Sequence, residues 1–291
     1  MTQKTKGIDE QLEQFDDYMR ISTSSAYNTI NKYVSIVRRF LLHTNMEFTL
    51  KDVNHWVSEK ARIKNTYTYR YALKHFLISL GKQDWARELV KVKNPPRKKV
   101  FRFIHKEKMQ KILDMLEGKQ RIIAFLQVKT GARISEIITL RAENIDFNIH
   151  PDLIYIRIGV NKSLTKGAKE RNLRLTKGYE TLLKKWISKP FGYLFLDSTH
   201  ENLDPETLLK KVDNVRRNLD KSLKKAGQWN GIDNLSSHAL RHVFADYFLK
   251  AGGEAAYLQK ALGHSNISTT MRYVSIDDQL VDRTILNMES D

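Results

Sequence analysis

Residues 236–273 read S-S-H-A-L-R-H-V-F-A-D-Y-F-L-K-A-G-G-E-A-A-Y-L-Q-K-A-L-G-H-S-N-I-S-T-T-M-R-Y and combine helical apolar spacing with many titratable side chains. His238 and Arg241 are three residues apart, so a helix places both on one face, where they can approach the same anion. Gly252 and Gly253 end this helix, and Gly263 ends a shorter one. We therefore expect two consecutive helices that carry a polar site.

The same stretch also predicts how the site is supported. An apolar stripe with spacings of three and four should face the core, and it consists of Leu240, Val243, Phe244, Tyr247 and Phe248. His264 directly follows the second helix, and Tyr273 comes nine residues later, after hydroxyl residues that could cap another helix. Tyr273 should therefore lie on a separate short element.

Two further motifs lie upstream, T-G-A-R-I-S-E-I at residues 130–137 and T-K-G-A-K-E-R at residues 165–171. Together with H-A-L-R-H and L-G-H-S-N-I-S-T-T followed by a tyrosine, these motifs resemble the tyrosine recombinases, also called the lambda-integrase family. The order of the separated motifs carries the resemblance, since each alone is a weak signal.

The resemblance implies cleavage of DNA by a tyrosine, through a 3′-phosphotyrosyl intermediate that needs neither ATP nor a metal, and no cofactor is expected. Arginine suits the binding of phosphate oxygens because its guanidinium stays charged and can bind an oxyanion with two donors. The implied catalytic residues are Arg133, Lys166, His238, Arg241, His264 and Tyr273.

The implied roles differ from residue to residue. Tyr273 attacks the phosphorus, the two arginines bind the non-bridging oxygens, His238 accepts the tyrosine proton and His264 hydrogen-bonds the phosphate. Lys166 protonates the leaving oxygen, with Lys162 and Lys169 as alternatives in the same loop. Glu136 is expected to hold an arginine in place, and His242 is interpreted as structural.

The charge of the chain agrees with a polyanionic partner. Its 291 residues carry 50 Lys and Arg against 33 Asp and Glu, a net charge of +17. Residues 1–100 contribute 19 of the basic and 10 of the acidic residues, so both halves share the excess. A generally basic, solvated surface is the alternative explanation. The chain has no cysteine, which excludes disulfides and thiolate metal sites.

Helical spacing predicts a four- or five-helix domain over residues 1–93, and Pro95-Pro96 interrupt the chain in a basic linker at residues 94–102. Residues 103–291 form the expected second domain. The fold class is mainly α, and the resemblance implies an N-terminal helical (SAM-like) core-binding domain beside a C-terminal α+β catalytic domain, which close on DNA as a clamp.

Within the second domain, alternating residues predict strands at 153–159 and 171–175, and a third at Tyr193–Leu196, in a small antiparallel sheet. Helices are expected at 105–116, 120–129 and 201–227. Residues 277–288 carry apolar residues at helical spacing, and this helix either docks on a neighbouring protomer, as the resemblance implies, or on its own domain.

Several basic residues are expected to contact DNA: Arg70, Arg97, Lys98, Lys99, Arg102, Lys169 and Arg272. Arg70 lies in T-Y-T-Y-R-Y, whose Tyr67 and Tyr71 could instead belong to the core, since they are four residues apart.

The predicted protein is thus a site-specific recombinase that binds double-stranded DNA with an inverted-repeat site, as a dimer per site and a tetramer in synapsis. A type IB topoisomerase and a non-catalytic DNA-binding regulator are the alternatives. The sequence leaves open chromosome-dimer resolution or mobile-element integration and excision. No apolar run reaches the length of a membrane span, and the N-terminus lacks the apolar core of a signal peptide, so we expect a cytoplasmic, nucleoid-associated protein.

Overall fold

The computed structural model describes residues 3–23, 25, 27–61, 66–91, 103–159, 170–187, 190–196 and 204–263. The chain divides into two compact units, residues 1–99 and 100–291, each with its own hydrophobic core. The two units are described separately. No helix in the described ranges is both long enough and apolar enough to cross a membrane.

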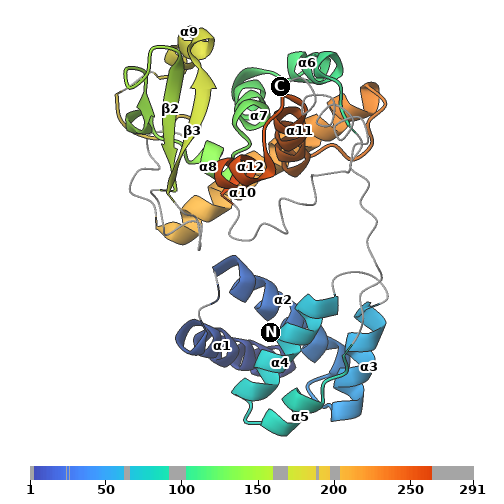
Figure 1. The fold of residues 1–291 in the computed structure, drawn as a ribbon. Coiled ribbons are helices and arrows are strands. Elements are labelled where there is room, and N and C mark those ends of the chain that lie inside the picture. The colour runs from blue at the N-terminus through green and yellow to red at the C-terminus, as the bar shows by residue number, and fades with distance from the viewer. Residues whose placement is uncertain are drawn as a thin grey trace. The chain divides into compact units, whose positions relative to one another are not determined.

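The N-terminal unit is helical throughout its described part (Figure 1). Its core is aromatic, with Phe15, Phe40 and Phe76 fully buried and with the rings of Phe15 and Phe76 meeting edge to face at 5.6 Å. The helices are α1 (Gln3–Ser22), α2 (Tyr27–Thr44), α3 (Leu50–Ala61), α4 (Thr66–Ser79) and α5 (Gln83–Glu88).

Helix α3 begins with a reciprocal cap between Thr49 and Asp52. Thr49 donates through its backbone nitrogen and its hydroxyl to Oδ2 of Asp52, at 2.8 and 2.7 Å, and the Asp52 nitrogen donates back to the Thr49 hydroxyl at 3.3 Å. These reciprocal bonds satisfy N–H groups that have no partner within a helix. They fix the first turn of α3, whose Val53, Trp56 and Val57 enter the core.

On α4 the expectation that Tyr67 and Tyr71 belong to the core is wrong, because they are 54% and 44% exposed. The buried side of the helix is formed instead by Ala72, Leu73, Phe76 and Leu77. A spacing of four aligns two tyrosines with each other but does not say which face they share. Arg70 folds back on its own unit and donates to the carbonyls of Leu89 and Val90.

The C-terminal unit has a three-stranded antiparallel sheet in the order β1-β2-β3, with β1 Ile145–Asp146, β2 Leu153–Ile158 and β3 Arg171–Thr176. Ile145 pairs with Ile156, and Ile156 pairs with Leu173. The prediction of a third strand at Tyr193–Leu196 is therefore wrong. That segment is tied to residues 140–142 by single backbone bonds and sends Phe195 and Leu196 into the core.

Most helices of this unit lie to one side of the sheet, and α7 and α11 pack side by side (Figure 1). The Asp204 side chain caps α10 by accepting from two backbone nitrogens, and Pro205 occupies the first turn. The helices are α6 (Lys106–Asp114), α7 (Gly118–Thr130), α8 (Ile134–Ile138), α9 (Glu180–Lys184), α10 (Pro205–Trp229), α11 (Ser237–Lys250) and α12 (Ala255–Leu262), with 3-10 turns η1 (Ala142–Asn144) and η2 (Lys177–Tyr179).

Candidate active site

The end of α12 is the point where separate motifs of the sequence meet. The helix stops at Gly263, whose φ of +66° is the left-handed conformation that glycine adopts without strain. The last carbonyls of a helix lack partners within it. Here three successive ones each accept from a different arginine: Ala261 from Arg171 Nε at 3.0 Å, Leu262 from Arg241 Nη2 at 2.6 Å, and Gly263 from Arg133 Nη2 at 3.4 Å. We call these three side chains the arginine cluster.

Arg241 is the buried member of the cluster, with 4% of its surface exposed. From α11 its Nη1 also donates to the carbonyl of Gly131 at 2.6 Å, which is the C-terminal cap of α7. Two helix C-termini, each with partial negative charge, thus hold one guanidinium in a fixed plane. The burial of this cation is compensated by charge-assisted hydrogen bonds.

Arg133 is the more accessible member, with its side chain 39% exposed. It is the residue before α8, and its backbone nitrogen donates to Glu136 Oε2 at 2.7 Å while Nη1 donates to Oε1 at 3.1 Å. The contact expected between Glu136 and an arginine is therefore present. Because α8 has five residues, few peptide dipoles add up at its N-terminus. Binding of an anion here depends on the guanidinium.

Arg171 is not among the residues that the sequence motifs single out. It is the first residue of β3, and it donates Nη1 to Glu136 Oε1 at 3.0 Å and Nη2 to Glu136 Oε2 at 2.9 Å. The side chains of Arg171 and Glu136 are 10% and 2% exposed. The sequence could have indicated Arg171 only as the last residue of T-K-G-A-K-E-R, a motif in which the lysines are the expected catalytic candidates.

Glu136 remains ionised in this setting. Burial raises the pKa of its carboxyl, but the hydrogen bonds and charges of Arg171, together with those of Arg133, outweigh burial and lower the pKa below its ordinary value. The carboxylate is therefore the anion that neutralises part of the arginine cluster.

His238 lies in the first turn of α11 and is exposed, whereas Arg241 on the same helix is buried. Its ring meets that of His242 edge to face, with centroids 4.8 Å apart. The start of α11 is fixed because the backbone nitrogen of Ser237 donates to Asp220 on α10 at 2.7 Å. His238 thus has solvent access from a rigidly held helix end.

The remaining predicted site residues lie outside the described residues: Lys166, His264 and Tyr273, the alternative Lys162, the predicted DNA contacts Arg97, Lys98, Lys99, Arg102, Lys169 and Arg272, and the helix expected at 277–288. Among the residues that are described, no three His, Asp or Glu side chains form a group that could hold a metal ion.

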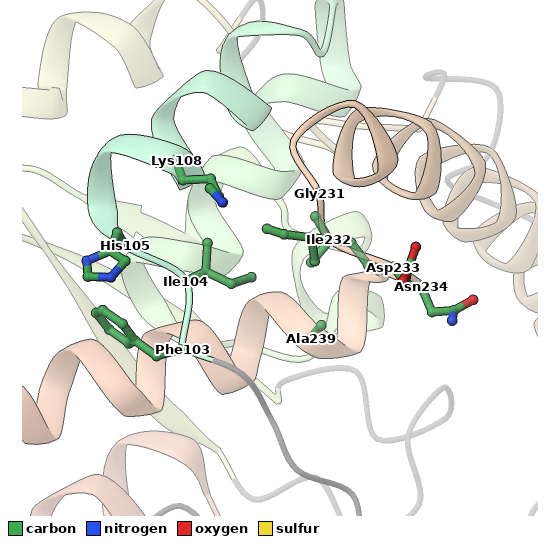
Figure 2. Close-up of a pocket in the computed structure, with 10 residues that line it drawn as sticks. Phe103, Ile104, His105, Lys108, Gly231, Ile232, Asp233, Asn234 and Ala239 are labelled. Carbon is green, nitrogen blue, oxygen red and sulfur yellow. The ribbon is translucent and has the colours of Figure 1, made fainter.

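A cavity of about 480 Å³ opens beside α11, where the chain enters the C-terminal unit. Figure 2 shows Ile104 and Lys108 on one side of the cavity and Ile232 on the other. None of the expected catalytic residues that the structure describes lines this cavity. Nearby, the Tyr247 hydroxyl donates to the Ile104 carbonyl at 2.8 Å, and the Lys250 ammonium lies 3.1 Å from the centre of the Phe103 ring. These contacts attach the start of the unit to the helix that carries Arg241.

The chain is similar in sequence and fold to known recombinases. Residues 102–279 match the family model described as the phage integrase family. The chain is 28% identical to tyrosine recombinase XerA of Pyrococcus furiosus over 282 residues, which cover 92% of this chain and 90% of the relative. It is 26% identical to a tyrosine recombinase of Thermosipho africanus, with 94% and 97% covered.

A crystal structure of the XerH site-specific recombinase, bound to a palindromic difH substrate in a post-cleavage complex, has the same fold, with a TM-score of 0.63. Its sequence is 18% identical, and the match covers 89% of this chain and 80% of that one. Since the family model spans more than half of the sequence and includes every expected catalytic residue, the protein belongs to the phage integrase family of tyrosine recombinases, enzymes that cleave and rejoin DNA.

Proposed function

We propose that the protein exchanges DNA strands at a specific inverted-repeat site, through a covalent 3′-phosphotyrosyl intermediate on Tyr273 and without metal or ATP. The observation that carries the proposal is the arginine cluster. Arg133 and Arg241, from motifs more than a hundred residues apart, both bond to the segment that ends immediately before His264. Two guanidinium cations held by hydrogen bonds at one helix end suit the charge that develops on a phosphate during displacement.

In the proposed reaction, the Tyr273 oxygen attacks the phosphorus while its proton passes to His238. Arg133 and Arg241 bind the non-bridging oxygens, and His264 donates a further hydrogen bond to the phosphate. The bond from phosphorus to the 5′ oxygen breaks, and Lys166 gives that oxygen its proton. The solvent access of His238 and the partial exposure of Arg133 are compatible with these roles. The reverse reaction with another strand's 5′ hydroxyl completes the exchange.

The proposed assembly is a dimer on each DNA site and a tetramer in synapsis, joined through the helix expected at 277–288. Both named relatives and the XerH structure belong to recombinases, and the difH substrate of XerH is palindromic, which supports an inverted-repeat site here. Such a protein would act on the nucleoid in the cytoplasm. The proposed biological setting is either chromosome-dimer resolution or the integration or excision of a mobile element.

The test is capture of covalent protein–DNA adducts from fragmented genomic DNA of the source organism, in EDTA, with sequencing of the attached DNA. The variants are wild type, Tyr273→Phe and Tyr257→Phe, the last an exposed tyrosine on α12 that serves as a matched control. We expect adducts at one inverted-repeat locus in wild type and Tyr257→Phe and none in Tyr273→Phe.

Other results would overturn parts of the proposal. Scattered adducts would favour a topoisomerase, and adducts in Tyr273→Phe would mean another nucleophile. Tight DNA binding without adducts in any variant would favour a binding protein without catalysis. The neighbours of the captured locus would separate chromosome-dimer resolution from mobile-element transfer.

A further inference from the structure

Arg171 makes more side-chain hydrogen bonds than the first residue of a strand needs for strand pairing. One guanidinium bonds both oxygens of Glu136 and, through Nε, the Ala261 carbonyl. It thereby joins β3, α8 and the end of α12. In the sequence, these elements adjoin three of the proposed catalytic residues: β3 follows the loop with Lys166, α8 follows Arg133, and α12 precedes His264.

The charges explain why such a residue is needed. Glu136 is an almost fully buried carboxylate, and a buried charge must be paired. Arg171 pairs with both oxygens at 2.9–3.0 Å, whereas Arg133 gives Glu136 a single side-chain contact at 3.1 Å. With Arg171 present, Glu136 does not depend on Arg133 alone. Without it, the carboxylate would pull the Arg133 guanidinium into a pair of its own.

Packing against Gly263 adds a second constraint. A Cβ at position 263 would lie 2.8 Å from Arg171 Nη1 and 3.0 Å from its guanidinium carbon. The planar group therefore lies directly against the backbone of the residue before His264. Moving Arg171 would leave space at that backbone and would release the Ala261 carbonyl.

We propose that Arg171 is a positioning residue for DNA cleavage, which neutralises Glu136 so that Arg133 stays available to the phosphate and which fixes the end of α12 ahead of His264. This inference rests on the function proposed above. The competing explanation is that Arg171 only stabilises the fold of β3.

The test uses a synthetic nicked duplex of the locus captured in the adduct experiment. Single-turnover cleavage is measured at saturating protein, the dissociation constant separately, and all at a temperature where thermal melts show each variant folded. The variants are Arg171→Ala, Glu136→Gln, the double variant Arg171→Ala/Glu136→Gln, Arg171→Lys, and Arg174→Ala. Arg174 is the matched control, because it is an exposed arginine on the same strand that lies over the Tyr155 ring.

We expect Arg171→Ala to slow cleavage about 100-fold, the scale of a misplaced reacting group, with the dissociation constant changed less than about threefold. The double variant should cleave about tenfold faster than Arg171→Ala, because no carboxylate then competes for Arg133. Arg171→Lys keeps the charge but not the two-pronged geometry, so its rate should also fall, by about tenfold. Arg174→Ala should cleave like wild type.

Three results would overturn the inference: an unchanged rate in Arg171→Ala, a double variant no faster than the single one, or a rate loss matched by an equal loss of affinity. If Arg171→Ala does not fold, the inference is tested with Arg171→Lys instead. Cleavage by Arg171→Lys at the wild-type rate would then refute the inference. Failure of the proposed function is a separate outcome, because wild type itself would then form no adduct.

Discussion

The interiors of the two units are stabilised in different ways. In the N-terminal unit the centre is filled by rings such as Phe15, Phe40 and Phe76, and its ion pairs, such as Arg38 with Asp9, lie at the surface. In the C-terminal unit an apolar core surrounds buried charges, Glu136 and Arg241, which are held by hydrogen bonds. The first interior is stabilised mainly by burial of apolar surface, while the second also depends on the neutralisation of charge.

This difference indicates where function lies. Burying a ring is favourable, whereas burying a charge costs free energy, so a chain that buries charge where its motifs meet gives up stability for a fixed arrangement of cations. We therefore expect substitutions in the two interiors to differ in kind. Those in the N-terminal unit should affect stability, and those in the arginine cluster should affect chemistry beyond their effect on stability.

The largest effect is expected from Arg241→Ala. Cleavage at saturating protein should fall about 1000-fold, because a donor to the phosphate is lost. The carbonyls of Gly131 and Leu262 also lose their partner, at a cost of about 3 kcal/mol in free energy of unfolding. Arg121→Ala, which removes a half-exposed surface arginine on α7, should stay within about 0.5 kcal/mol and cleave normally. Equal losses of cleavage rate and of stability in the two variants would contradict the special role given to Arg241.

The next effect is expected from Phe76→Ala in the aromatic core. Loss of this fully buried ring should cost about 3–5 kcal/mol. Hydrogen exchange on the full chain should show lost protection in α1 to α5, with α7 and α11 unchanged. Leu42→Ala, at a 56% exposed side chain on α2, should change stability by less than about 0.5 kcal/mol. Loss of protection in α11 would mean that the two interiors do not act independently.

A smaller effect is expected from Gly263→Ala, compared with Gly252→Ala. Both residues have a positive φ, +66° and +87°, so each alanine should cost about 1 kcal/mol of backbone strain. A Cβ at 252 meets no atom within 4 Å, whereas one at 263 meets Arg171. Gly263→Ala alone should therefore slow cleavage, by about tenfold. Equal rates in both variants would show that the contact with Arg171 does not matter.

The smallest effect is expected in the dependence of stability on pH. The pKa of Glu136 is lower in the folded chain than its ordinary value of 4.5, so below about that pH the unfolded chain binds the proton first. The stabilisation from the ionised carboxylate is thus complete above the ordinary value and is lost as the pH falls through the folded one. The stability difference between wild type and Glu136→Gln should be constant near neutrality and shrink in acid. A constant difference down to acid pH would contradict this assignment.

Local patterns predicted a large part of the fold and drew attention to two members of the arginine cluster. The helix end at Gly263 and the cap at Thr49 follow from residue types within a few positions, and Arg133 and Arg241 stand in recognisable motifs. Arg171 could not be found in this way, because its partners Glu136 and Ala261 are 35 and 90 residues away. The exposure of Tyr67 and the pairing of Ile145 with β2 likewise depend on neighbours distant in sequence.

The hydrogen bonds at the end of α12 also have a consequence for biosynthesis. Their carbonyls belong to residues 261–263, so a nascent chain that has emerged only as far as α11 contains all three arginines but lacks these three acceptors. Domains fold largely as units while they are synthesised. A ribosome that stalls or a message that ends early would release a chain able to fold its N-terminal helices but not to hold its cations in place. We expect such truncated products to bind DNA without cutting it, so that incomplete translation does not leave broken strands.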